Sequence, residues 1–151
     1  MNRVRIKAIV AAIGVAGLGA CATIEEGVGQ LVADTYTANL TGAQEVGGGD
    51  PDGSGKAEIT VSDELNQICW NLSDIRNIGD IAAAHIHVGA AGTNGPPVFT
   101  LTQSNEGAWR GCKNDSEWKE DRIEGNPEAF YVNVHTAEYP AGAIRGQLSK
   151  K

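Results

Sequence analysis

The three histidines of this 151-residue chain fall in two short segments of similar character. His85 and His87 lie within 82–100, where small and β-branched residues lead into a turn rich in glycine and proline. His135 lies within 130–148, which has the same order of strand, turn and strand residues. Because side chains alternate between the two faces of a strand, His85 and His87 share one face. Any chemistry of this chain is therefore expected where the two segments meet.

Two interpretations of the histidines stay open. Imidazole is a common ligand of copper and zinc, and His135 on a neighbouring strand would add a third nitrogen to the His85–His87 pair, leaving one position open. Neutral histidine also carries one donor and one acceptor, so the same side chains could hydrogen-bond to loop carbonyls and close the end of a sandwich. We favour the hydrogen-bonded network. A single copper or zinc ion is the alternative, and no cofactor is certain.

Four polar residues are possible partners of the histidines, namely Glu45, Asn133, Glu138 and Arg145. Asn133 and Tyr131 share the strand face of the third histidine. Glu138 follows in the next turn, where it could orient an imidazole, although an exposed position is the simpler expectation. Arg145 could offer a forked donor to an anion, but a structural salt bridge with Glu138 or Glu45 is preferred.

The elements that must position these residues are predominantly strands. Alternating or β-branched runs separated by glycine, proline and asparagine turns indicate an all-β, antiparallel Greek-key sandwich or barrel of about seven or eight strands. The charged stretch 114–124 holds at most one short helix, beginning near Glu117, or is a solvated surface loop. The expected strands are 35–41, 56–61, 67–72, 82–88, 97–101, 107–112, 130–135 and 143–148.

The first 34 residues are expected to export and anchor the domain. A basic opening is followed by an uncharged apolar run too short to span a bilayer, which indicates a signal peptide over 1–20. The run ends in Leu18-Gly-Ala-Cys21, which resembles the lipobox of bacterial lipoproteins, so Cys21 would carry lipid. Residues 21–34 are then a tether and 35–151 the domain. Ala22 is not the aspartate that retains some lipoproteins at the inner membrane, which favours the outer membrane in a Gram-negative cell.

The charge balance limits the class of partner. Cleavage after residue 20 would remove three basic and no acidic residues, taking the net charge from −7 to −10. Such an acidic surface argues against nucleic acid and anionic headgroups as partners. Contact with the membrane is expected through the lipid on Cys21.

With Cys21 assigned to lipid, Cys69 and Cys112 remain. An even pair in an oxidising compartment is most simply a disulfide. Two buried thiols or two soft metal ligands are the alternatives.

The two histidine segments and the opening of the domain resemble a known family. The motifs are Ala84-His-Ile-His-Val-Gly89 with the following Gly-Thr-Asn-Gly-Pro turn, the run from Tyr131 to Leu148, and Asn39-Leu-Thr-Gly-Ala-Gln-Glu45. Together they are similar to the CHRD (chordin-like) domain, over roughly residues 35–148. Ala143 departs from the pattern, because the family often has Glu before Ile-Arg-Gly.

The resemblance implies an extracellular β-sandwich module without an established catalytic activity. We therefore expect a non-enzymatic, lipid-anchored binding or structural module of the cell envelope, whose partner is an envelope protein or another ligand. The alternative is a protein that binds one copper or zinc ion. Three histidines are too few for a two-metal site like that of copper/zinc superoxide dismutase, to which the pattern bears a weaker analogy.

Overall fold

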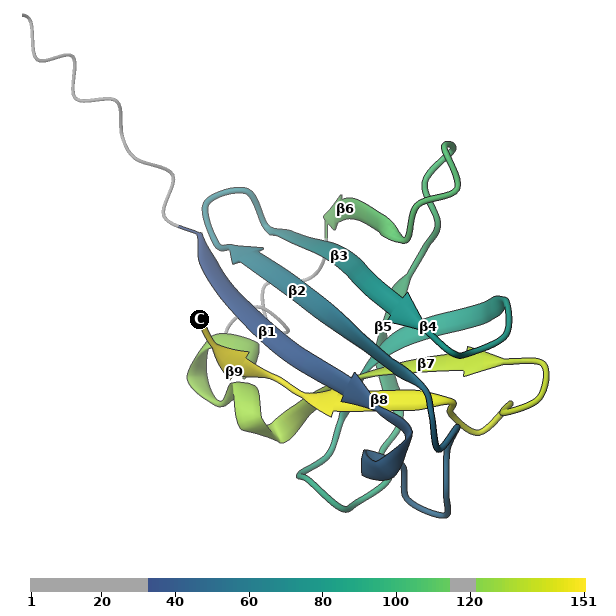
Figure 1. Ribbon diagram of the computed structural model, residues 1–151. Coiled ribbons are helices and arrows are strands. Elements are labelled where there is room, and N and C mark those ends of the chain that lie inside the picture. Colours follow the sequence, from purple (N-terminus) through teal and green to yellow (C-terminus); the bar gives the residue numbers. More distant parts are fainter. Residues whose placement is uncertain (1–32, 115–121) are drawn as a thin grey trace, which may run out of the picture. The chain divides into compact units, whose positions relative to one another are not determined.

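The computed structural model describes residues 33–114 and 122–151 (Figure 1). The expected signal peptide, the lipidated Cys21 and nearly all of the tether lie outside the described residues, as does Glu117 at the start of the predicted helix. Within the described part, β1 begins at Asp34, one residue before the expected start of the domain.

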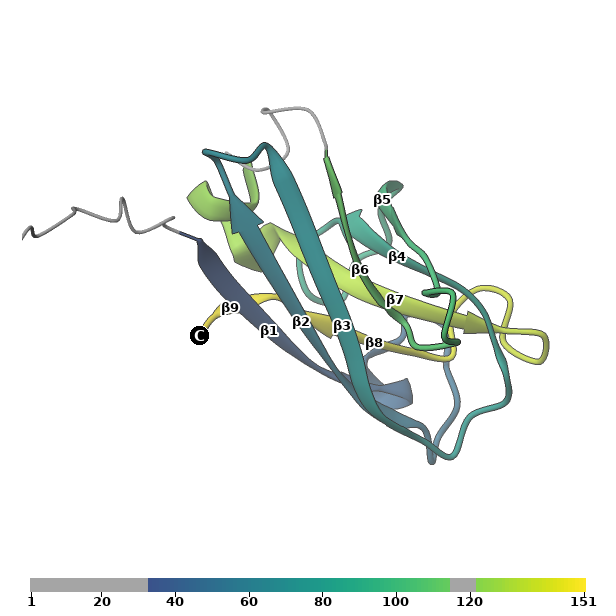
Figure 2. The ribbon, with the colours of Figure 1, turned by 90° about the horizontal axis from the view of Figure 1, so that it is seen from above.

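The described residues form one antiparallel sheet that curls into a nearly closed barrel (Figures 1 and 2). The sheet follows the order β5-β4-β7-β8-β1-β2-β3-β6, and β9 pairs with β1. All eight predicted strands are present, and the all-β antiparallel prediction is confirmed. The strands are β1 (Asp34–Thr41), β2 (Ser54–Ser62), β3 (Gln67–Arg76), β4 (Ile81–Val88), β5 (Pro97–Leu101), β6 (Arg110–Asn114), β7 (Phe130–Thr136), β8 (Ile144–Gln147) and β9 (Ser149–Lys150).

The short strand β9 was not predicted from the sequence. Its side chains are exposed, so no apolar alternation marks it. Backbone pairing with β1 and an ion pair between Lys150 and Asp34, 2.8 Å apart, hold it in place.

The two ends of the sheet, β5 and β6, approach each other across β3. The Trp70 indole of β3 packs edge-on against Phe99 of β5, with ring centroids 5.7 Å apart. The same indole N–H donates a hydrogen bond to the Thr102 carbonyl at 3.1 Å. These contacts join β3 to β5 and to the residue that follows it, across the interior of the barrel.

Strict alternation of side chains fills the interior. In β7, Phe130, Val132 and Val134 point into the core, and in β4 Ala84 and Ile86 face them. The same rule places Tyr36, Leu40, Ile59 and Ile68 inside. The polar members of β4, β7 and β8 are therefore directed to the outer face of the barrel.

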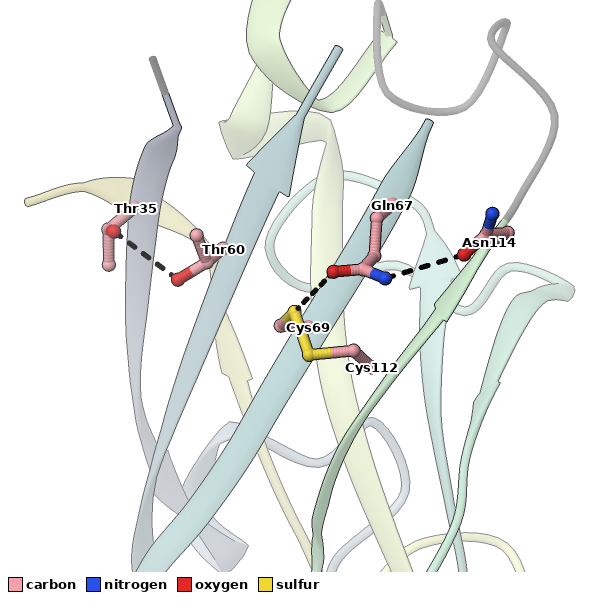
Figure 3. Close-up of a disulfide and its surroundings, with 6 residues drawn as sticks. All are labelled: Thr35, Thr60, Gln67, Cys69, Cys112 and Asn114. Carbon is pink, nitrogen blue, oxygen red and sulfur yellow. Dashed lines mark hydrogen bonds between the residues drawn. A yellow bond between two sulfur atoms is a disulfide. The ribbon is translucent and has the colours of Figure 1, made fainter. Parts of the chain in front are cut away.

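The predicted disulfide is confirmed. Cys69 of β3 and Cys112 of β6 are directly opposite each other and are bonded, with Cα atoms 4.0 Å apart (Figure 3). Beside the disulfide the Gln67 amide donates to the Asn114 side-chain oxygen at 3.3 Å. Both links join β6 to the barrel.

Helical structure is sparse in the described part of the chain. Residues 122–125 form a single α-helical turn, which is followed by the 3₁₀ turn Pro127–Ala129, and a second 3₁₀ turn spans Gly42–Gln44. The short helix predicted to begin at Glu117 was expected to end at 125–127, and the described helical residues end at Gly125. Within residues 33–114 and 122–151, no helix is both long enough and apolar enough to cross a membrane.

Candidate functional site

The three histidines meet on the outer face of the barrel because β4 and β7 are direct neighbours. The antiparallel register pairs His85 with Asn133 and His87 with Tyr131, and His135 lies opposite Ala83. The residues between them face the core. The prediction that the two histidine-bearing faces converge from neighbouring strands is therefore confirmed.

The imidazole rings form a compact cluster. One nitrogen from each histidine lies within 4.8 Å of the corresponding atoms of the other two. The rings of His85 and His135 are 5.1 Å apart between centroids and inclined at 64°, and those of His85 and His87 are 5.6 Å apart. Three neutral nitrogen donors at this spacing match the protein ligands of an open metal site.

Two of the imidazoles are oriented by loop carbonyls. Nδ1 of His87 lies 2.8 Å from the Gly95 carbonyl oxygen, and Nδ1 of His135 lies 3.1 Å from that of Pro140. A carbonyl only accepts, so Nδ1 carries the proton in both rings and Nε2 presents a lone pair. This is the hydrogen-bonded closure by loops that the sequence favoured.

Three of the four nitrogens that remain are buried and have no hydrogen-bond partner in the described structure. They are Nδ1 of His85, Nε2 of His87 and Nε2 of His135. The two interpretations of the sequence therefore use different atoms of the same rings. The loop carbonyls take one nitrogen from His87 and from His135, and the nitrogens directed at the centre of the cluster stay free to bind something else.

Burial keeps the cluster neutral. His87 is only 8 % exposed, and His85 and His135 are half-buried. Desolvation is the main cause that lowers the pKa of all three side chains below the usual histidine value. The neighbouring imidazoles lower the pKa of His85 and His87 further, whereas the bonds to Gly95 and Pro140 act in the opposite direction. Neutral imidazole is the form that binds metals.

A stacked column extends the site along the face. Tyr131 lies parallel to His87, with ring centroids 4.9 Å apart and an angle of 17°. The Arg145 guanidinium lies 4.2 Å above the Tyr131 ring. Arg145 is 2 % exposed and donates to the Asn94 side-chain oxygen at 3.0 Å and to the Thr93 carbonyl at 2.9 Å.

The preferred salt bridge of Arg145 with Glu138 or Glu45 is wrong for the described structure. Neither carboxylate forms an ion pair with Arg145 in the part of the chain that the structure describes. Arg145 points into the loop after β4, whereas Glu138 is exposed in the turn after β7 and has no hydrogen bond to an imidazole among the described residues. The expected second role of Glu138, orienting an imidazole, gains no support from this placement.

The loop 89–96 covers the column because Gly95 permits a close approach. A β-carbon at this position would overlap the Val88 carbonyl oxygen of β4. With glycine there, the backbone lies flat against the strand, and the Gly95 carbonyl reaches His87 while its N–H donates to the Tyr131 hydroxyl at 3.1 Å.

Glu45 and Asn133 make a second buried polar pair beside the cluster. Both Glu45 Oε1 and Asn133 Oδ1 lack a hydrogen-bond partner in the described structure. They flank Gly142, where an added β-carbon would lie 2.5 Å and 2.7 Å from these two oxygens. Burial raises the pKa of Glu45 to about 7, although Arg145 lowers it. Asn133 is thus placed on the histidine face as predicted, between His135 and Tyr131.

The sequence did not assign a role to Tyr131, Gly95 or Asn94. Tyr131 was placed on the correct face by strand alternation, which was the available signal for its contact with His87. Gly95 and Asn94 lie in a loop. A loop has no hydrophobic periodicity from which its contacts with a strand could be predicted. Their contacts with His87 and Arg145 depend on the path of the loop in space.

Comparison with known proteins identifies one family. The model of the CHRD domain matches residues 36–148, which include most of β1, all of β2 to β8, the disulfide and all three histidines. No curated protein and no solved structure matches the chain.

Proposed function

The chain belongs to the CHRD domain family, and from this premise we propose that it is a lipid-anchored, extracytoplasmic module that binds a ligand or supports the cell envelope and catalyses no reaction. The single observation that carries this proposal is the family match over almost the whole described domain. CHRD domains are typically extracellular, and the Cys69–Cys112 disulfide fits an exported protein.

The anchoring part of the proposal depends on Cys21. Its place after a basic and then apolar opening supports cleavage and lipid attachment at this residue. More than one acyl chain gives stable retention in a bilayer. For a Gram-negative source we propose the outer membrane. The acidic mature chain supports a partner that is a protein or small ligand, with nucleic acid excluded.

Fractionation tests the anchor. The wild-type chain should sediment with membranes, and mass spectrometry should find an acylated N-terminal peptide beginning at Cys21. The Cys21→Ser variant should remain unprocessed, without the acyl mass. Recovery of the wild-type chain in the soluble fraction, with an unmodified Cys21, would refute the anchor and leave the family assignment intact.

A specific observation favours a second candidate function, the binding of one metal ion. The three histidines lie close enough to share one ion, and each has one buried nitrogen without a hydrogen-bond partner in the described structure. The test is elemental analysis of the purified chain after dialysis against copper and zinc in turn. About one retained ion per chain, lost in a folded His85→Ala/His135→Ala variant, is the expected result. No retained ion would leave the histidines as part of the hydrogen-bonded closure alone.

A further inference from the structure

We infer that the histidine cluster binds a single copper ion, through Nδ1 of His85, Nε2 of His87 and Nε2 of His135. This inference rests on the second candidate function, metal binding, and specifies its metal and its ligand atoms. Two observations support it: one nitrogen from each of the three histidines lies within 4.8 Å of those of the other two, and each histidine has one buried nitrogen without a hydrogen-bond partner in the described structure.

The ligand atoms are assigned from the hydrogen bonds of the opposite nitrogens. The Gly95 and Pro140 carbonyls hold the protons on Nδ1 of His87 and His135, so both Nε2 atoms are acceptors. An acceptor buried without a donor costs about 1–3 kcal/mol. A cation satisfies all three nitrogens at once when His85 carries its proton on Nε2.

The three imidazole nitrogens are slightly farther apart than they would be around a bound ion, so the rings would have to move closer together. Nitrogens about 2.0–2.1 Å from a shared metal are about 3.4 Å from each other in a three- or four-coordinate site. The present limit of 4.8 Å is wider than this. His85 makes no hydrogen bond through Nδ1 in the described structure, so its ring is free to turn toward the other two.

The donor set favours copper over zinc. Among the described residues the converging group contains three histidines and no carboxylate or thiolate. Structural zinc sites are closed by four protein ligands, which this group does not supply. Three histidines with one open position hold zinc in catalytic sites, and imidazole is equally suited to copper, so the choice between the two metals depends on their affinities for nitrogen donors. Nitrogen donors also bind Cu²⁺ more tightly than Zn²⁺ in the usual order of divalent metals.

The surrounding charge favours the monovalent state, Cu⁺. The Arg145 guanidinium lies 4.2 Å from the centre of the Tyr131 ring, and this ring also stacks on His87. A buried guanidinium repels a cation bound by the neutral imidazoles, and the repulsion energy is proportional to the charge of the cation. Cu⁺ brings half the charge of Zn²⁺ and accepts three ligands.

The test is a competition experiment on the full chain, purified in detergent and stripped of metal. Cu⁺ is kept reduced with ascorbate under anaerobic conditions and competes against bathocuproine disulfonate, and Zn²⁺ competes against a zinc-binding dye. We expect one Cu⁺ per chain and an affinity at least 100-fold above that for Zn²⁺. His87→Ala and His135→Gln should each weaken Cu⁺ binding at least 100-fold, whereas the matched variant Glu138→Gln, exposed in the same turn as Pro140, should bind as the wild type does.

The ligand atoms are read by NMR, because Cu⁺ is diamagnetic. Long-range ¹H–¹⁵N spectra should show protonated Nδ1 in two histidines before and after copper is added, with shifts at their Nε2 and at Nδ1 of the third. Shifts at Nδ1 of all three rings would overturn the assignment of atoms.

The possible failures are distinguishable. Zinc binding equal to or tighter than copper binding would overturn the inference and leave metal binding in place. Retention of neither ion by a chain with an intact disulfide and a wild-type circular dichroism spectrum would overturn both. Copper binding unchanged in the two histidine variants would place the ion elsewhere and overturn the inference.

Discussion

Removal of the Cys69–Cys112 disulfide should lower the free energy of unfolding by about 4 kcal/mol. The two cysteines are 43 residues apart, and the entropy of closing a loop of this length in the unfolded chain gives that value. Cys112 is exposed and Cys69 half-buried, so replacement by alanine leaves little cavity and adds little packing loss. The loss of stability therefore comes mainly from the greater conformational entropy of the unfolded chain without the disulfide.

The assay is urea unfolding of the Cys69→Ala/Cys112→Ala variant and the wild type, followed by tryptophan fluorescence. With a slope of about 1.5 kcal/mol/M, the midpoint should fall by about 2–3 M. Wild-type protein reduced with a phosphine is the matched control and should unfold near the midpoint of the variant. A loss below about 1 kcal/mol would refute the reasoning, because it would mean that the bridge does not restrict the unfolded chain.

Three further changes test β8 and the polar residues near the histidine cluster. Arg145→Lys should cost about 2 kcal/mol in urea unfolding, because lysine lacks the planar fork that stacks on Tyr131 and reaches two acceptors; an unchanged midpoint would contradict this. The raised pKa of Glu45, about 7, means that the folded state holds the proton more tightly than the unfolded state. Its contribution to stability is therefore complete below about pH 4.5 and is lost as the pH rises through 7, and Glu45→Gln should flatten stability measured across this range, whereas an unaltered pH profile would argue against a buried carboxyl. Gly146→Ala would push a methyl group against the Asn39 carbonyl oxygen of β1, and the melting temperature should fall by about 10 °C or more; a wild-type melting curve would show that β8 can shift away.

The strands were predictable because one face of each is buried in a common core. Alternation in β1, β2 and β3 marks the buried side chains, and the turn residues mark the ends. The exposed β9 lacks this signal, since backbone pairing with β1 is its main support. Local pattern thus identifies strands that contribute to the core.

The candidate site was predictable only in part. The spacing of His85 and His87 placed two imidazoles on one face, and strand alternation added Asn133 to the face of His135. The contacts of Arg145 were predicted wrongly, because the sequence shows a nearby carboxylate but not the path of the loop that brings Asn94 and Thr93 over the guanidinium.

By itself the sequence determined the fold class, the disulfide partners and the set of histidines that share a surface. These depend on alternation and on composition, which are properties of short segments and of counts. The tertiary structure decided which nitrogen of each imidazole is free. That outcome depends on the register of β4 against β7 and on two loops whose carbonyls return to His87 and His135. Such contacts join residues through space, and no local pattern encodes them.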